Sequence, residues 1–322
     1  VLNSKRMRHR WPSFLCTFAR APVTSAWEEV VRASETDARM GWPAGVPFRL
    51  KRLIAGNAEV AIGIVGPAAR HDLDVVVRMP RGDLGRARCM TNARALAQLA
   101  DTTMAEYVPR AVVSGEWAGQ GYHVETRCRG GPLLSDRIDA GDAIRMVCRQ
   151  WLDFQLTSRE RTSLTTDDYS ALVGRLFADI RRYLDLGAAH ARLAALEEWL
   201  RRALLDQPLP LVYGHGDFKL GNLLFDRHCA LTAIIDWDRA VARGLPLLDH
   251  LLLLIYQLRH RVGGLQKAFV QHILPWQLAP GDAWFGEEPA ARLAVTERQF
   301  LALRVVLWLQ ILSEHFSVIH KL

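Results

Sequence analysis

Apolar and polar positions divide the chain from residue 48 onward into two regions with different periods. The first region holds short runs rich in β-branched and aromatic residues with glycines between them, a pattern typical of β-strands. These runs cover residues 48–54, 59–65, 73–79, 111–114 and 122–127. A stretch of helical character at residues 85–100 interrupts them. The pattern predicts a small antiparallel sheet with one helix.

The second region follows Gly130, Gly131 and Pro132 and consists mainly of long amphipathic segments. They span residues 142–156, 169–186, 188–205, 246–262 and 290–316. Two apolar runs at 223–225 and 231–235 are different, because they flank a polar turn at 226–228. This predicts a β-hairpin inside a mainly helical region.

Composition supports two folded regions. The chain has 322 residues, of which 50% are hydrophobic and 23% are charged, which excludes a disordered protein. Single cores stop growing at about 250 to 300 residues, so two lobes are expected. We assign residues 1–47 to an N-terminal extension with no structure predicted, 48–130 to a β-rich lobe and 131–322 to a helical lobe.

Charge and cysteine content narrow the partners and the compartment. The net charge is +7, but arginines spread along the chain supply most of it, since only 5 of 41 basic residues are lysine. We therefore expect no nucleic-acid partner. No apolar run approaches the roughly 20 residues that a membrane span needs. Five scattered cysteines without a C-x-x-C pair point to a reducing compartment, and we expect the cytoplasm.

The polar segment with the clearest chemistry is His215-Gly216-Asp217-Phe218-Lys219-Leu220-Gly221-Asn222, directly ahead of the hairpin. Asp236 follows Asn222 by fourteen residues, at the end of the second hairpin strand. The hairpin folds Asp236 back toward Asn222 and Asp217. Two carboxylates and an amide oxygen are ligands that Mg²⁺ prefers.

This spacing of His, Asp and Asn before a strand-end Asp resembles the aminoglycoside phosphotransferase and choline kinase-like family. The match includes Ile234-Ile235-Asp236-Trp237-Asp238 and Gly244-Leu245-Pro246-Leu247-Leu248-Asp249, and it is strongest over residues 211–249. The resemblance implies a two-lobed α+β fold like that of protein kinases. In it, a small antiparallel sheet with one helix binds the nucleotide, and a larger helical lobe carries catalysis and the acceptor.

The resemblance also implies roles for these residues. Asp217 would act as the catalytic base, and Asn222 and Asp236 would coordinate Mg²⁺ bound to ATP, with GTP as an alternative nucleotide. His215 would support the loop. Lys219 would either reach the transferring phosphate or be an ordinary surface lysine. Asp249 is expected to tie down the helix after Pro246.

In the β-rich lobe the resemblance places the nucleotide cover at Gly56 and Asn57. Arg78 stands where the family usually has lysine, and it can bind phosphate through its fork of donors. Residues 124–131, which include Glu125 and Arg127, resemble the segment that binds adenine through its backbone. A second departure lies in the helix, where Asn92 takes the place of a glutamate and supplies no charge to Arg78.

The function expected is a kinase that phosphorylates a hydroxyl of a small molecule. The alternative is a catalytically silent nucleotide-binding or scaffolding module, because Arg78 and Asn92 depart from the family pattern. A protein kinase is a third interpretation, weakened by the lack of a recognisable activation segment between Asp236 and Pro246. The sequence contains no G-x-x-x-x-G-K-[ST], H-E-x-x-H, G-x-S-x-G or complete G-x-G-x-x-G motif.

Overall fold

The computed structural model describes Trp27, Val31, Arg32 and residues 46–54, 59–68, 70–117, 120–133, 140–160, 163–205 and 208–319. The chain forms two compact units. The first consists of Val1–Gly82 and Val112–Arg127, and the second of Asp83–Ala111 and Cys128–Leu322. The helix between the third and fourth strands therefore groups with the second unit, whereas the lobe boundary at residue 130 remains a prediction.

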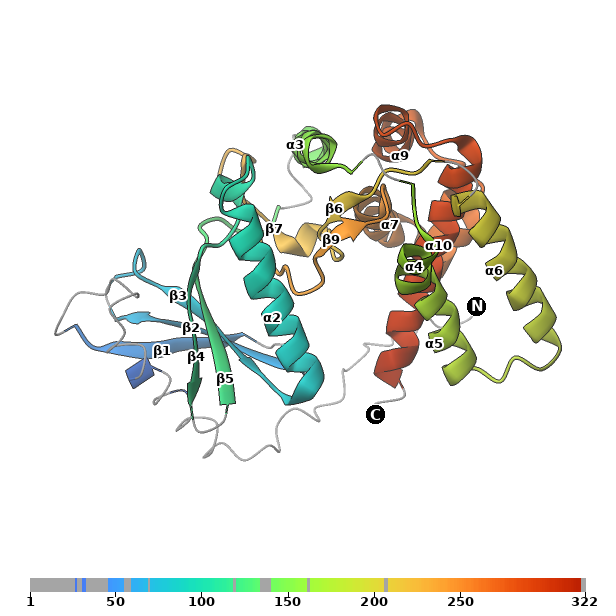
Figure 1. Ribbon diagram of the computed structural model, residues 1–322. Helices are drawn as coiled ribbons and strands as arrows, with labels where there is room; N and C mark the ends of the chain where they lie inside the picture. The colour runs from blue at the N-terminus through green and yellow to red at the C-terminus, as the bar shows by residue number, and fades with distance from the viewer. Residues whose placement is uncertain are drawn as a thin grey trace, which may run out of the picture. The chain divides into compact units, whose positions relative to one another are not determined.

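The first unit is built on a five-stranded sheet with strand order β1-β2-β3-β5-β4 (Figure 1). Its strands are β1 Phe48–Ile54, β2 Val60–Pro67, β3 Val75–Pro80, β4 Ala111–Trp117 and β5 Gln120–Thr126. The pairs β1 with β2, β2 with β3, and β3 with β5 are antiparallel. The expected small antiparallel sheet is confirmed.

The two faces of this sheet have different chemistry. Successive side chains of a strand point to opposite faces. Val77 of β3 and Val124 of β5 are paired and lie in an apolar cluster with Trp27. A Cβ atom on Gly63 would lie 2.8 Å from the Trp27 ring, so this position needs a glycine for the indole to pack. Arg78 and its neighbours on β5 therefore lie on the opposite face.

The second unit is mainly helical. Its helices are α2 Gly82–Leu99, α3 Ala140–Ser158, α4 Thr166–Tyr169, α5 Arg175–Tyr183, α6 His190–Leu205, α7 Leu248–Val262, α8 Leu265–Ala268, α9 Pro280–Arg292 and α10 Glu297–Ile319. Short 3₁₀ or π turns lie at η3 Ala105–Tyr107, η4 Ser170–Gly174, η5 Gly187–Ala189, η6 Leu220–Asn222 and η7 Phe269–Ile273. Helix α10 packs beside α5 and α6 (Figure 1). Trp151, Phe177 and Trp237 are fully buried in the large core that joins these elements.

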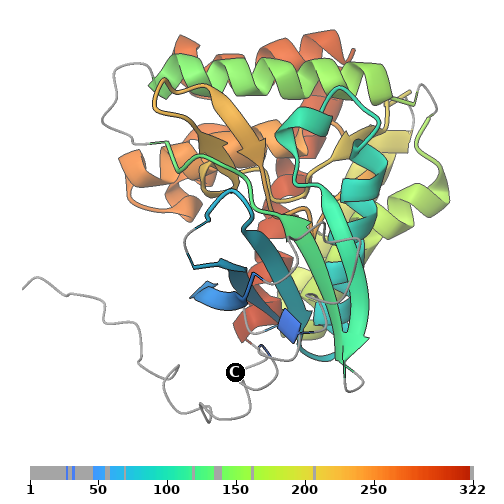
Figure 2. The same ribbon diagram turned by 90° about the vertical axis from the view of Figure 1, so that its left-hand side faces the viewer.

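Two small strand pairs are set into this helical unit. Strand β7 Leu223–Phe225 pairs with β8 Leu231–Ile234 in antiparallel fashion, which confirms the predicted hairpin. Strand β6 Val212–Gly214 pairs with β9 Val241–Gly244, a pair that the sequence analysis did not predict. In Figure 2 helix α3 extends lengthwise above the hairpin strands. The loop that follows β6 and the turn that follows β8 carry the polar residues of the expected site.

The predicted helix at residues 290–316 is wrong at its start. Helix α9 ends at Arg292, and Ala294 has a left-handed backbone (φ 56°) that no α-helix continues through. A new start signal follows. The amide of Thr296 donates to Gln299 Oε1 (3.0 Å), and the amide of Gln299 donates back to Thr296 Oγ1 (3.3 Å). This reciprocal cap begins α10 at Glu297.

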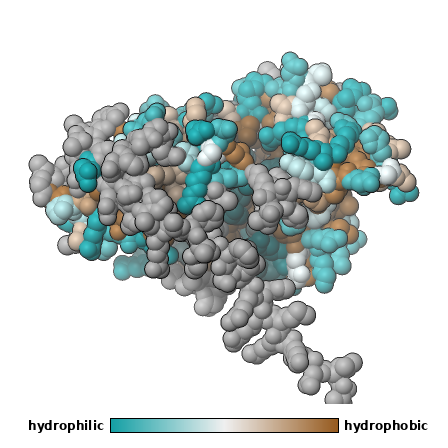
Figure 3. Space-filling model, turned by 90° about the horizontal axis from the view of Figure 1, so that it is seen from below, coloured by the Kyte–Doolittle hydropathy of each residue, from teal (hydrophilic) through white to brown (hydrophobic). Residues whose placement is uncertain are grey.

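Polar residues (teal) are interspersed with small groups of apolar ones (brown) on the described part of the face drawn in Figure 3. Among the described residues, no helix has the length and the apolar character to cross a membrane.

Candidate active site

The loop at residues 215–222 leaves β6 and ends in the η6 turn, just before β7. Within it the amide nitrogen of Asn222 donates to the backbone oxygen of Asp217 (2.8 Å) and to its carboxylate oxygen Oδ2 (3.1 Å). Asp217 is 8% exposed and Asn222 is 6% exposed. The two side chains are therefore fixed to each other in a nearly buried loop.

Asp236 follows the end of β8, and the hairpin brings it to the same place. The backbone N–H of Ile235 donates to the backbone oxygen of Asn222 (2.9 Å). Asp236 itself has a left-handed backbone with φ 70°, an unfavourable conformation for a residue with a side chain. Such strain is concentrated at functional sites. The structure therefore brings Asp217, Asn222 and the turn at Asp236 together.

His215 is fully buried and links the loop to the hairpin. Its Nδ1 accepts the backbone N–H of Asp217 (3.2 Å), so Nε2 carries the proton and donates to the backbone oxygen of Ile235 (3.0 Å). Burial lowers the pKa of His215, against the opposing effect of nearby carboxylates that include Asp249. We conclude that His215 is neutral and supports the loop through hydrogen bonds, and that it does not act as a general acid.

The carboxylate of Asp249, in the first turn of α7, holds the other side of the loop. Oδ2 accepts the backbone N–H of His215 (2.8 Å) and the indole N–H of Trp151 (3.2 Å), and Oδ1 accepts the backbone N–H of Gly216 (3.0 Å). Burial raises the pKa of Asp249, while these bonds and His215 act in the opposite direction. Asp249 therefore fastens the loop to the helix, as its predicted tie-down role requires.

Gly216 allows the backbone of the loop to lie close to the backbone of Arg239. It has φ 78°, and a Cβ atom there would lie 2.2 Å from the backbone oxygen of Arg239.

The guanidinium of Arg239 forms an ion pair with Glu314 of α10. Burial works to lower the pKa of Arg239, but Glu314 and the carboxylates of Asp217 and Asp238 raise it overall. Sequence reasoning missed Arg239, although its position directly after Asp236-Trp237-Asp238 was a signal.

Lys219 lies beside Asp217. Its Nζ donates to Asp217 Oδ2 (2.6 Å), and its side chain is 32% exposed. The ammonium group also lies 5.8 Å from the ring centre of Tyr256 in α7, and the guanidinium of Arg259 lies 4.3 Å from the same ring. Lys219 is therefore part of the Asp217 site rather than an isolated surface lysine.

In the first unit, the structure describes three of the five residues predicted to bind the nucleotide, because Gly56 and Asn57 lie outside the described residues. Arg78 of β3 is 5% exposed, and its Nε donates to Glu125 Oε1 of β5 at 3.1 Å. Glu125 is also 5% exposed. Arg78 thus has a buried carboxylate partner on the neighbouring strand.

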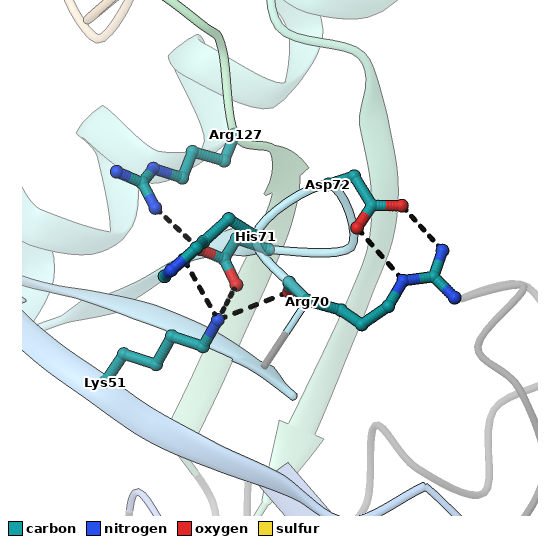
Figure 4. Close-up of polar contacts among 6 residues, drawn as sticks. Lys51, Arg70, His71, Asp72 and Arg127 are labelled. Atoms are coloured by element: carbon teal, nitrogen blue, oxygen red, sulfur yellow. Dashed lines mark hydrogen bonds and ion pairs between the residues drawn. The ribbon is translucent and has the colours of Figure 1, made fainter. Parts of the chain in front are cut away.

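Arg127, at the end of β5, contacts Asp74 rather than the Arg78 pair. Figure 4 shows the side chains of Lys51, His71 and Arg127 gathered at one place. The carboxylate of Asp74 receives Lys51 Nζ at 2.5 Å and Arg127 Nη1 at 2.5 Å there. Burial alone would raise the pKa of Asp74, but hydrogen bonds from Lys51, Arg127 and His71 lower it overall. This cluster fastens the segment after β5 to β1 and to the start of β3.

The side chain of Asn92 in α2 bonds to the turn that follows β8. Its Oδ1 accepts the backbone N–H of Trp237, which directly follows Asp236, at 3.1 Å. Asn92 is 2% exposed. One helical turn earlier, Arg88 lies 3.6 Å from Asp238 Oδ2. Helix α2 therefore holds the segment after β8 from two positions.

No cluster of three or more His, Cys, Asp and Glu side chains among the described residues could hold a metal ion by itself. Asp236 and Asn222 offer one carboxylate and one amide oxygen. Mg²⁺ is commonly held by one or two protein ligands with water and substrate phosphates supplying the rest. The donor set therefore fits Mg²⁺ carried in with a nucleotide.

Comparison with known proteins agrees with this geometry. Residues 55–284 match the phosphotransferase enzyme family. The chain belongs to that family. The expected relationship to aminoglycoside phosphotransferases is confirmed, as is the expectation of a phosphotransferase enzyme. A curated mouse (Mus musculus) protein, acyl-CoA dehydrogenase family member 11, is 32% identical over an alignment 109 residues long that covers 31% of this chain. The match spans only 14% of the length of that relative.

Solved structures of this family share the fold. A thermostable mutant of an aminoglycoside phosphotransferase, solved with ADP and hygromycin B, has a TM-score of 0.60 at 16% identity, covering 92% of this chain and 93% of its own. A fructosamine-3-kinase from Haemophilus somnus has a TM-score of 0.54 at 10% identity, covering 90% of this chain and 99% of its own. The predicted α+β, protein-kinase-like fold is thereby confirmed.

Proposed function

We propose that this phosphotransferase moves the γ-phosphate of ATP to a hydroxyl of a small molecule, with Mg²⁺ and with Asp217 as the catalytic base. The observation that carries the proposal is the loop in which Asn222 is bonded to Asp217 while the backbone of Ile235 is bonded to Asn222. This arrangement supports the proposal because it brings together, from separate parts of the sequence, the residues that would serve as the base and as two oxygen ligands. The ADP bound to the similar aminoglycoside phosphotransferase supports nucleotide use.

Each residue has a distinct part in the proposed reaction. Asp217 takes the proton of the acceptor hydroxyl as its oxygen bonds to the γ-phosphorus, and the bond to the β,γ-bridging oxygen breaks to release ADP. Asn222 turns its amide nitrogen to Asp217, so its amide oxygen is the atom that would hold Mg²⁺ together with Asp236. The metal ion would neutralise charge on the phosphates. Lys219, which is bonded to Asp217, is proposed to stabilise negative charge on the transferred group.

The protein needs to supply little covalent chemistry in this reaction, because phosphoryl transfer depends mainly on alignment of the reacting groups and neutralisation of charge. His215 and Asp249 supply alignment by fixing the backbone on both sides of Asp217. In the first unit, Arg78 is the proposed phosphate-binding cation. The backbone at Glu125 and Arg127 is proposed to bind the base of the nucleotide, and Gly56 and Asn57 to cover its phosphates.

The test is a panel of metabolites and antibiotics assayed for ADP release with Mg·ATP, with Asp217→Asn as the blank. Calorimetry of Mg·ATP binding accompanies it. Release that depends on an acceptor and disappears in Asp217→Asn, while binding persists, supports the proposal. A wild-type chain that binds no Mg·ATP and no Mg·GTP contradicts it.

The second candidate is a catalytically silent nucleotide-binding or scaffolding module, favoured by the arginine at position 78 and the neutral Asn92. The same assays separate the two. Binding of Mg·ATP without ADP release for any acceptor would favour the silent module, whereas release that depends on Asp217 excludes it.

A further inference from the structure

The buried ion pair of the first unit does not follow the pattern expected from the sequence. Arg78 lies on β3 and Glu125 on the adjacent strand β5, where Arg78 is paired with His123 and Val76 with Glu125. Residues two apart on a strand share a face, so Arg78, His123 and Glu125 lie on the same face. The Nε to Oε1 distance of 3.1 Å is that of a direct hydrogen bond. The pair is therefore a diagonal contact across two strands.

Both side chains of this ion pair are buried, so each needs the other to balance its charge. Arg78 and Glu125 are each 5% exposed, and an ionised side chain at such depth is tolerated only with a partner. A guanidinium carries five N–H donors, and the bond from Nε uses one of them. Pairing with Glu125 through Nε therefore does not by itself prevent Arg78 from binding a phosphate oxygen. The contact also limits the rotamers of a long side chain, which lowers the entropic cost of binding.

Asn92, at the helix position expected to restrain Arg78, bonds to a different segment. Asn92 is neutral, and its side-chain oxygen accepts the backbone N–H of Trp237 in the second unit. Its position in the sequence therefore does not identify the group that balances the charge of Arg78. A carboxylate bonded to Arg78 is present on the neighbouring strand instead.

His123 lies directly opposite Arg78 and could have competed for Glu125 if it were charged. Burial lowers its pKa, Glu125 acts to raise it and Arg78 lowers it further. The ring nitrogen Nδ1 lies 2.7 Å from Ser114 Oγ, which gives the neutral imidazole a hydrogen-bond partner. His123 therefore has a hydrogen-bond partner of its own outside the Arg78–Glu125 pair.

We propose that Glu125 is the positioning residue that holds Arg78 for the phosphates of the nucleotide, in place of a glutamate from the helix. This inference rests on the proposed function, because it needs Arg78 to bind a nucleotide phosphate. Glu125 acts through Arg78 and does not itself contact the nucleotide phosphates.

A double-mutant cycle measured as the Kd of Mg·ATP tests it without knowledge of the acceptor. The variants are Arg78→Gln, Glu125→Gln and the double variant. Glu116→Gln is the matched control, since it neutralises an exposed glutamate of the same sheet. Each single variant is expected to weaken binding about tenfold, the scale of one charge-assisted hydrogen bond. The double variant is expected to bind no more weakly than Arg78→Gln, and Glu116→Gln as tightly as the wild type.

Several results would overturn the inference. If the two effects multiply in the double variant, or if Glu125→Gln binds like the wild type, Glu125 does not act through Arg78. Partial recovery of binding in Glu125→Asp is expected, because it retains the charge. If circular dichroism shows that Glu125→Gln is unfolded, Glu125→Asp replaces it in the cycle, with a smaller but equally non-additive effect. A wild-type chain that binds neither Mg·ATP nor Mg·GTP overturns the proposed function and this inference together, whereas a multiplicative cycle overturns the inference alone.

Discussion

Asp249 is the residue whose removal best tests how the loop at residues 215–222 is held. Its carboxylate accepts three N–H groups, from His215, Gly216 and Trp151, and it is 4% exposed. In Asp249→Ala all three donors lose their acceptor in a buried site. Each unsatisfied donor costs about 1 to 3 kcal/mol, and entry of water into the vacated space recovers part of this. We therefore expect the free energy of unfolding to fall by about 3 to 5 kcal/mol.

The assays are chemical denaturation and ADP release. Because the three bonds fix the backbone beside Asp217, we expect kcat to fall at least tenfold in the fraction that remains folded. Asp142→Ala is the matched control, since Asp142 also lies in the first turn of a helix but has a side chain that is 81% exposed. Its loss should change stability by less than about 1 kcal/mol. If Asp249→Ala has the same free energy of unfolding and the same kcat as this control, the three bonds do not hold the loop.

Three further predictions concern other contacts of the site. Gly216→Ala should abolish most ADP release, because a Cβ atom would lie 2.2 Å from a backbone oxygen, whereas Gly141→Ala, with open space around it, should not. Asn92→Ala should lower the free energy of unfolding, measured by chemical denaturation, by about 1 to 3 kcal/mol because it leaves the buried N–H of Trp237 unsatisfied. Asp74→Asn should lower the free energy of unfolding by about 3 kcal/mol at pH 7. Since the folded pKa of Asp74 lies below its ordinary 3.8, this difference from the wild type should begin to shrink below about pH 4 and be lost as the pH falls through the folded pKa.

Local patterns account for the parts of the fold that were predicted. Strand β1 begins and ends at the residues expected, and the β7–β8 hairpin forms around the expected turn, because alternation and turn chemistry act within a few residues. The same is true of the loop from His215 to Asn222. The backbone between Asp217 and Asn222 is short enough for the two side chains to bond directly, whereas their roles in the reaction stay predictions.

Contacts between distant segments were harder to predict. Strands β6 and β9 are three and four residues long and are separated by the whole loop and hairpin, so neither has a pattern of its own. The break between α9 and α10 depends on the left-handed backbone at Ala294, which alanine does not signal. The cap formed by Thr296 and Gln299 did carry a readable signature and was overlooked.

The partner of Arg78 shows why position alone could not supply the whole site. Carrying a family pattern onto the chain assigns the partner by its place in a helix, which led to Asn92. In an antiparallel sheet, however, the residues that face one another are set by register, and no fixed sequence offset gives it. Arg78 and Glu125 are 47 residues apart, and they meet because β3 pairs with β5 in the register that sets Val76 opposite Glu125. A glutamate could therefore be lost from the helix without loss of the ion pair, provided that the sheet supplied a carboxylate on the same face.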